Sequence, residues 1–448
     1  MSTKTCSVPH KFPPPWVSIS SQSVLPAPLR IPSLPSPPRQ DTIHVAYTLS
    51  THIIPAVLPR LVPDVPVPKV PIHISSIPAS ERRKQATTVI RELIERQMCF
   101  AQGKLTSDRS QKPLWNCINR YVRVHRHDTL RTGLTLFLVP ATGFPKEIWE
   151  TMLQSLLDST SGLLVDEVWS WEAVNHGDSA LVNALTVTSI GSNILSVDWH
   201  NDACDIANFL LNYLPEEATP ASLPTCLERV PEATSDARKE LGYHCRRLVV
   251  VGHSFGGTSP TLAALNFPKL FSSLILVDLI ILADKARTVE EAVRFAVNAF
   301  TRRMFWSSRE DALRQFKQSP FFASWHPEVL KTYVDHGLTV DAAGGVRLKM
   351  TTVQEGLSYV SVPICFEVWK LLEKLDENIT LRWVVSSPGF LGEEETKVRV
   401  WRRPTNASNV VFPSVGHLIV QEAPVELAQD IATFLSRNYG SPQIKAAL

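Results

Sequence analysis

The most constraining feature of the chain is the segment Arg247–Leu262, RLVVVGHSFGGTSPTL, where an apolar run leads into G-x-S-x-G and then into a helical pattern. A serine on a sharp turn between a strand and a helix has strained backbone angles, and its hydroxyl is exposed above the edge of the sheet. Glycines flank it because side chains there would collide with the neighbouring strand and helix. The motif predicts Ser254 as a nucleophile.

Apolar runs alternate with helical patterns through the middle of the chain. Strands that are apolar throughout are buried on both faces, which is typical of a mostly parallel sheet covered by helices on both sides. We therefore expect an α/β fold. The expected strands are Leu134–Pro140, Asn193–Val197, Arg247–Val251, Ser273–Val277 and Leu381–Val385, and the clearest helices are Ala86–Phe100, Lys146–Leu157, Pro260–Leu265 and Val425–Leu435.

Proline divides the chain unevenly, since half of its 34 prolines lie within the first 80 residues. Proline at this density favours an extended, largely disordered segment. Ala283–Tyr359 lacks strand-like runs between two parts of the core, which is the expected form of an all-helical lid. The expected parts are an extension at 1–80, the core at 81–280 and 375–440, the lid at 281–374 and a tail at 441–448.

Composition excludes several classes of function. The chain has 45 Lys+Arg against 43 Asp+Glu and no basic block, which argues against a nucleic-acid partner. No apolar run approaches the roughly 20 residues of a membrane span. The seven cysteines are scattered without C-x-x-C spacing, so neither disulfides nor zinc is expected. With no secretory signal pattern, we expect an intracellular protein. The expected serine chemistry needs no metal or organic cofactor.

A serine nucleophile that attacks a carbonyl needs backbone donors for the oxyanion. One donor is expected from the residue after the nucleophile, Phe255. The other should follow an early strand, and Leu134–Trp149, LTLFLVPATGFPKEIW, runs from a strand into a turn and a helix. The amide of Phe144 is the candidate there.

The general base is expected to be a histidine late in the chain, after the acid in sequence order. Pro413–Val420, PSVGHLIV, places His417 after a glycine and before the helical pattern near the end of the chain. His253 adjoins the nucleophile, but its side chain should point away from the site and pack elsewhere.

The acid has two candidate positions. The strand Leu381–Val385 is followed by no carboxylate until Glu393, Glu394 and Glu395, whereas the preceding strand ends directly at Asp278. Either position can orient the histidine because the two strand ends are neighbours. We favour Asp278 and keep the glutamates open.

These residues resemble the α/β-hydrolase superfamily over roughly residues 115–437. Asn175–Ser179, NHGDS, also looks like a loop of that superfamily that is structural more often than catalytic. THIIPAVLPR from Thr51, PLWNCINRY from Pro113 and PATGFPKEIW are similar to fungal peroxisomal-lipase-like and toxin-biosynthesis hydrolases. The resemblance implies an α/β-hydrolase fold with a helical lid. It also implies a serine hydrolase of secondary metabolism that acts on a small apolar or lipid-like ester.

Three features depart from these families. Pro140 stands where the oxyanion motif usually has histidine, the chain ends Lys445-Ala446-Ala447-Leu448 rather than Ser-Lys-Leu, and the proline-rich extension has no recognised counterpart. We expect the cytoplasm first and the peroxisome through the resemblance alone. A C–C bond hydrolase with the same triad, and an inactive ligand-binding protein of the same fold, remain alternatives.

Overall fold

A computed structural model describes residues 31–39, 42–58, 60, 78–125 apart from 102–112, 133–187, 198–283, 289–361, 363–387 and 389–440. The central feature is an eight-stranded sheet of order β1-β2-β4-β3-β5-β6-β10-β11. β2 runs antiparallel to both of its neighbours, and every other pairing is parallel. The bounds are β1 Tyr47–Pro55, β2 Trp115–Arg123, β3 Leu134–Val139, β4 Val165–Trp171, β5 Arg247–His253, β6 Ser273–Val277, β10 Thr380–Ser387 and β11 Ala407–Pro413.

This sheet confirms the expected α/β-hydrolase architecture, and four of the expected strands form its centre as β3, β5, β6 and β10. The expected strand Asn193–Val197 lies outside the described residues. The other four strands of this sheet were not expected. β1 lies in the expected extension, β2 and β4 carry buried charges such as Arg120 and Glu167, and β11 is a largely exposed edge strand.

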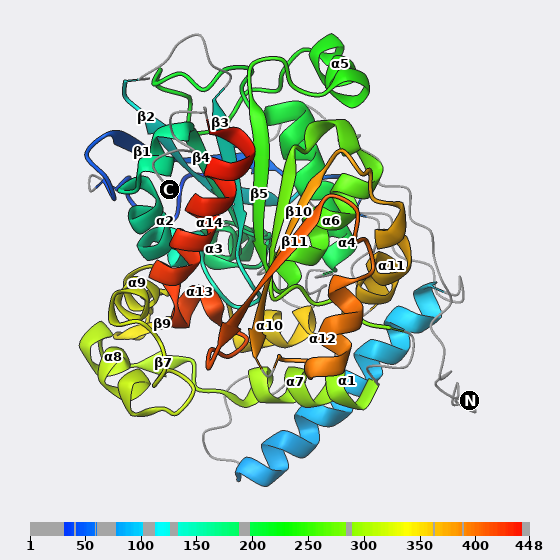
Figure 1. Cartoon of the computed structure of the whole chain (residues 1–448). Coiled ribbons are helices and arrows are strands. Elements are labelled where there is room, and N and C mark those ends of the chain that lie inside the picture. The colour runs from blue at the N-terminus through cyan, green and yellow to red at the C-terminus, as the bar shows by residue number, and fades with distance from the viewer. Residues whose placement is uncertain are drawn as a thin grey trace.

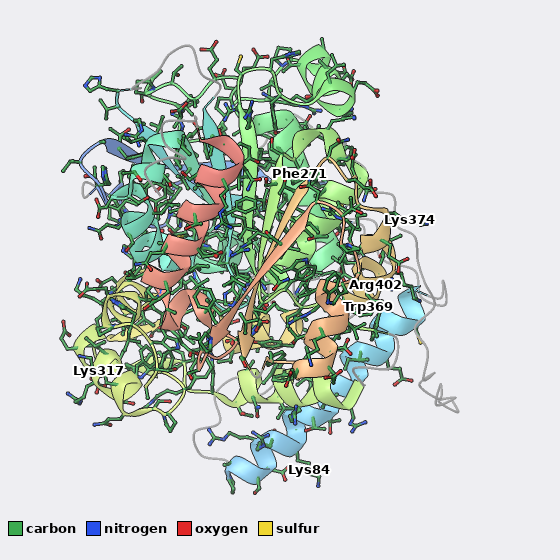
Figure 2. All side chains as sticks on the ribbon, viewed as in Figure 1. Lys84, Phe271, Lys317, Trp369, Lys374 and Arg402 are labelled. Atoms are coloured by element: carbon green, nitrogen blue, oxygen red, sulfur yellow. The ribbon has the colours of Figure 1, made fainter. Side chains whose placement is uncertain are left out.

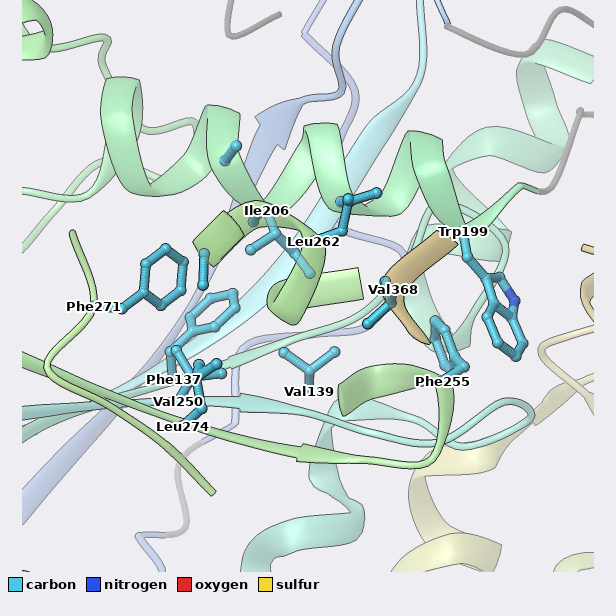
Figure 3. Packing of buried hydrophobic residues seen from close by; sticks show 14 of the residues in the cluster. Phe137, Val139, Trp199, Ile206, Val250, Phe255, Leu262, Phe271, Leu274 and Val368 are labelled. Carbon is cyan, nitrogen blue, oxygen red and sulfur yellow. The ribbon is translucent and has the colours of Figure 1, made fainter. Parts of the chain in front are cut away.

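Successive side chains of the central strands point to opposite faces of the sheet, so the hydrophobic core has two layers. Phe137, Val250 and Leu274 face one layer, whereas Leu136 and Val249 face the other. Because successive side chains of a strand point to opposite faces, an apolar run fills both layers at once. Figure 3 shows the first layer, with Phe137, Val250 and Leu274 opposite Ile206 and Leu262 of two helices.

Helices cover both faces of the sheet, α2 and α14 on one side and α4, α6 and α11 on the other (Figure 1). The bounds are α1 Ala79–Ala101, α2 Glu150–Leu157, α3 Gly177–Val187, α4 Trp199–Asn208, α5 Glu232–Leu241, α6 Phe255–Asn266, α7 Val289–Thr301, α8 Arg309–Gln318, α9 Pro327–Gly337, α10 Thr352–Ser358, α11 Pro363–Leu371, α12 Glu393–Val400, α13 Ile419–Glu422 and α14 Pro424–Tyr439. Short helical turns at Lys146–Trp149 and Phe209–Tyr213 precede α2 and extend α4.

The insertion after β6 is mostly helical, but the expectation of an all-helical lid is wrong. A small antiparallel sheet of order β7-β9-β8 joins Phe305–Trp306, Val346–Leu348 and Leu338–Val340. Strands of two or three residues are too short to show alternation in the sequence. The later part of the segment is also not lid, since α11 packs on α6 in the core, and Trp369 of α11 lies under Arg402, 4.8 Å from the ring centre (Figure 2).

The expectation that residues 1–80 form a disordered extension is also wrong in part. β1 lies within that range and pairs along its length with β2, and its Pro55 closes the strand, where a missing N–H costs no internal ladder bond. Upstream, Ser36 donates a hydrogen bond to Asp178 (2.8 Å), and Arg39 forms an ion pair with Glu150. The core therefore begins before residue 81.

α1 packs against the lid rather than against the central sheet. Ala86, Ile90 and Ile94 of α1 form one cluster with Val293 and Val297 of α7. Figure 1 shows the two helices side by side at the lower edge of the molecule, and Lys84 of α1 is exposed (Figure 2). Among the described helices, none has the length and apolar character to cross a bilayer.

Candidate active site

Ser254 stands on the sharp turn between β5 and α6, with φ 58° and ψ −123°. Its amide donates to the carbonyl of Val277 on β6 at 3.0 Å, which holds the turn on the sheet. A Cβ at Gly252 would lie 2.1 Å from the Gly256 carbonyl oxygen, and one at Gly256 would lie 2.3 Å from that of Pro140. The glycines of the motif are therefore required by close backbone contacts.

His417 lies in the loop between β11 and α13, as the sequence predicts. Its Nε2 is 2.9 Å from Ser254 Oγ, and its Nδ1 is 2.8 Å from Asp278 Oδ2. The side chain is 18% exposed, so the imidazole remains open to the cavity above the serine. These distances are those of a base that can take the hydroxyl proton.

His253 points away from the nucleophile, and its Nε2 donates to the backbone carbonyl of His417 at 2.8 Å. Burial, followed by the neighbouring His417, lowers the pKa of His253 to about 3, so its ring is neutral near pH 7. A neutral ring that donates from Nε2 fixes the loop that carries His417. The expected packing role is thus joined by a positioning role.

Asp278, at the end of β6, is the acid that meets His417. Its carboxylate also accepts from Ser386 Oγ at 2.9 Å and from Arg399 Nη2 at 3.1 Å. Burial alone would raise the pKa of Asp278, but the His417 hydrogen bond and charge, with Arg399, lower it to about 2. Asp278 is therefore ionised near pH 7.

The alternative acids lie elsewhere. Glu393, Glu394 and Glu395 make up the first turn of α12, and the first two form exposed ion pairs with Lys397 at 2.9 and 3.0 Å. No sequence signal indicated Ser386 and Arg399, because their contacts with Asp278 depend on how β10 and α12 lie beside the end of β6.

The two expected oxyanion donors differ in how their amides are used. Phe255 is the first residue of α6, so its amide has no carbonyl one turn earlier to bind. The Phe144 amide donates to the carbonyl of Ala141 at 3.3 Å, closing the turn after β3. Its aromatic ring, however, lines the cavity beside Ser254.

Thr142 is a second donor candidate in the same turn. It lines the cavity with Ser254, and no residue in the described part of the chain accepts a hydrogen bond from its amide. The next amide, of Gly143, donates to His176 Nε2 at 3.0 Å, while Nδ1 of that ring is 2.8 Å from Asn175 Oδ1. His176 therefore holds the turn in place.

The NHGDS loop also anchors a network of buried charges. Asp178 binds Lys146 at 2.7 Å and Lys349, next to the lid sheet, at 2.6 Å. Burial would raise the pKa of Asp178, but the two lysines lower it far below its usual range. The loop thus connects the oxyanion turn with the lid, which agrees with the structural role expected for it.

A cavity of about 220 Å³ opens above Ser254 and His417. Its wall is mostly aromatic and comes largely from the lid: Phe295, Phe321, Phe322, Tyr333 and Tyr359, with Phe390 from beyond β10. Two charged residues, Arg302 and Glu355, line the same cavity. Within the described ranges, no three metal-binding side chains group to hold an ion.

A serine on a strand–helix turn, with His417 and Asp278 at the ends of other strands of a mostly parallel sheet, defines the α/β-hydrolase class. The model of the alpha/beta hydrolase family matches residues 136–430, and the chain belongs to this family. Both the expected superfamily and its fold are thereby confirmed.

Two curated proteins illustrate its relatives. The chain is 26% identical over 325 residues to the peroxisomal membrane protein LPX1 of Saccharomyces cerevisiae, covering 67% of this chain and 74% of that protein. It is 28% identical over 186 residues to the type I acyl-CoA thioesterase mpaH of Penicillium brevicompactum, but this match spans only 35% of that enzyme.

One solved structure shows the same fold over nearly the whole molecule. The peroxisomal alpha-beta-hydrolase Lpx1 of Saccharomyces cerevisiae superposes with a TM-score of 0.60 at 18% identity, covering 90% of this chain and 96% of that one. The resemblance to fungal peroxisomal hydrolases predicted from the sequence is thus confirmed.

Proposed function

We propose that the protein is a serine-dependent hydrolase that cleaves carboxylic esters with an apolar acyl part. The observation that carries this proposal is the continuous series Ser254–His417–Asp278, with contacts of 2.9 and 2.8 Å. Ser254 and His417 line the cavity, and Asp278 is buried behind His417, so the series combines a nucleophile, a base and an ionised acid.

In the proposed reaction, Ser254 Oγ attacks the ester carbonyl while His417 Nε2 takes its proton. Asp278 holds the imidazole by Nδ1 and stabilises its charged form. The tetrahedral intermediate collapses to an acyl-serine as His417 returns the proton to the leaving alcohol. Water then attacks the acyl-serine in the same way, which releases the acid and restores the serine.

We assign the oxyanion to the amides of Phe255 and Thr142, in place of Phe255 and Phe144. The Phe144 amide already donates to Ala141, whereas the Thr142 amide has no described acceptor. Donors fixed before the reaction stabilise developing charge without reorganisation. The same donors can stabilise the oxyanion formed from a thioester. Thioesters are a second candidate substrate class, because one relative is named as an acyl-CoA thioesterase.

Labelling with a fluorophosphonate, which reacts with an activated serine, tests the proposal. We expect the wild type to label and Ser254→Ala to remain unlabelled, with His417→Ala strongly slowed. Matched 4-nitrophenyl esters and acyl thioesters then compare the two substrate classes. Absence of labelling in folded wild-type protein would overturn the hydrolase proposal and favour a ligand-binding protein, while labelling without turnover of either class would favour a C–C bond hydrolase.

An intracellular location is part of the proposal, supported by the cysteine pattern and by the named peroxisomal relative. Fluorescent tagging at an internal exposed turn, such as residues 342–344 between β8 and β9, would distinguish cytoplasm from peroxisome while leaving both termini as they are.

A further inference from the structure

The aromatic cavity contains one ion pair that the proposed chemistry does not use. Arg302 follows α7 and Glu355 lies on α10, and Arg302 Nη2 is 2.5 Å from Glu355 Oε2. Both residues line the same cavity as Ser254 and His417. The pair is therefore within the space that a bound substrate would fill.

Stability is a poor reason for such a pair. Removing two charges from water costs several kcal/mol per ion, and replacing a buried pair with apolar residues of similar size is often neutral or stabilising. The neighbouring Phe295, Tyr333 and Tyr359 show that the wall is otherwise built from aromatic side chains. A charged pair in this wall is better explained by a polar group on the ligand.

The guanidinium is the half of the pair that is open to a ligand. Arg302 is 28% exposed in its side chain, against 8% for Glu355. Its Nε and Nη2 are buried, so a ligand would meet the side chain through the part that is exposed in the cavity. Burial raises the pKa of Glu355, which opposes the binding of a cationic ligand group there. The guanidinium also contacts Tyr333, and its five N–H donors outnumber these two partners, which leaves capacity for a carboxylate.

The position of the pair relates it to the reacting carbonyl. A Cβ at Gly143 would lie 3.3 Å from Glu355 Oε1, and Gly143 adjoins Thr142, the assigned oxyanion donor. A group bound at Arg302 would thus lie in the cavity that the oxyanion turn also lines, and we place the acyl part of the substrate between the two. The aromatic wall between them suits the apolar chain that joins the two ends.

We infer, on the basis of the proposed function, that the substrate is the ester of an acyl chain with a second, anionic carboxylate, and that Arg302 binds that carboxylate. Arg302 is then the residue that selects a dicarboxylic half-ester over a neutral ester of the same shape.

Kinetics with a matched pair of probes tests this selection. One probe is the mono-4-nitrophenyl ester of octanedioic acid, and the other is the same molecule with its free carboxylate methylated. Hydrogen bonds to a charged group contribute about 1.5–3 kcal/mol, so we expect kcat/KM to favour the charged probe by about 10–100-fold. Arg302→Gln should lower that ratio toward unity, and Arg302→Lys should restore part of it.

The adjacent exposed residue supplies the control. Arg303 points away from the cavity and contacts Gln315, so Arg303→Gln should keep the wild-type ratio. A ratio near unity in the wild type, or one unchanged by Arg302→Gln, would overturn the inference. Equal losses with Arg303→Gln would do the same, because they would indicate a general disturbance of the lid.

Binding without chemistry separates this inference from the proposed function. Calorimetry with Ser254→Ala compares octanedioic acid monomethyl ester with the dimethyl ester. The charged ligand should bind more tightly, and Arg302→Gln should remove that preference. If this is found while the wild type is not labelled by fluorophosphonate, the carboxylate site is retained and the hydrolase proposal is rejected. Labelling and turnover without any preference for charge would reject only the carboxylate site.

Discussion

The triad and the cavity wall meet at Ser254 but are built in different ways. Ser254, Asp278 and His417 follow β5, β6 and β11, and the first two strands are buried on both faces. The wall opposite comes from α7, α9 and α10. α7 and α10 pack on each other and on α1, whereas α9 packs on α8 and α2. In the proposed reaction, the geometry of the chemistry thus depends on the sheet, whereas the choice of substrate depends on the lid.

This difference predicts that substitutions in the two regions separate kcat from KM. Groups attached to buried parallel strands are held closely in place, and a loss there removes transition-state stabilisation. Lid residues contact substrate at a distance from the reacting atoms, so a loss there changes binding first.

The largest expected effect is at the base. His417→Ala should lower kcat/KM roughly 10⁴–10⁶-fold, because Ser254 loses the acceptor of its proton. Ester hydrolysis and fluorophosphonate labelling rates measure it, with circular dichroism to show that the fold is retained. A variant that keeps more than about a tenth of the activity would contradict the assignment of His417 as the base.

Asp278→Asn should lower kcat roughly 10³–10⁴-fold, because an amide cannot stabilise the charged imidazole. Glu394→Gln is the matched control, since its side chain is exposed and pairs with Lys397. Comparable losses in both variants would reopen the choice of acid.

Asp278 should also contribute to stability in a pH-dependent way. Its pKa is about 2 in the folded protein against an ordinary value of 3.8, so the stabilisation is present above pH 4 and is lost as the pH falls to about 2. The difference corresponds to about 2 kcal/mol in the free energy of unfolding. Urea unfolding between pH 4 and 2 should fall less steeply for Asp278→Asn, which is already less stable at pH 7 because Arg399 is left unpaired.

A buried contact between α1 and the lid should affect substrate binding. Ile90 is fully buried between α1 and α7, and Ile90→Ala should destabilise the protein by about 2–5 kcal/mol. We expect KM to rise by roughly fivefold while kcat changes little. Thr87→Ala, on the exposed side of α1, is the control. A fall in kcat alone would show that α1 supports the triad instead.

The smallest expected effect lies behind the triad. His253→Leu removes the donor to the His417 carbonyl, a bond worth about 1 kcal/mol, and should lower kcat about fivefold. His253→Gln can still donate at a similar position and should regain most of that loss. If the two variants are equal, packing rather than the hydrogen bond explains the role of His253.

The sequence predicted the parts whose signal is local. The glycines around Ser254, the apolar runs of β3, β5, β6 and β10, and the position of His417 before α14 each depend on a few neighbouring residues. The choice of Asp278 followed from its place at a strand end, and the structure brings that carboxylate to His417.

What the sequence did not predict depends on contacts between distant segments. β2 and β4 have no apolar run because they carry Arg120 and Glu167, which pair at 2.7 Å. Arg246, directly before β5, also pairs with Glu167 at 2.5 Å. Thr142 gave no signal of its own, since its suitability as a donor follows from which neighbouring amides are already bound. The lid strands were missed because each is too short to show a period, although the Asp341–Gly345 turn between two of them is rich in glycine.

The triad also has a consequence for how the protein is made. His417 is 139 residues from Asp278 and 163 from Ser254 along the chain. A growing polypeptide therefore holds its nucleophile and acid long before the base has left the ribosome. Loop closure over such separations is slow compared with local folding, so the serine becomes reactive only when β11 and α14 dock. On the proposed mechanism, the newly synthesised protein is therefore protected from premature acylation, and we expect the onset of labelling to report the docking of β11 and α14.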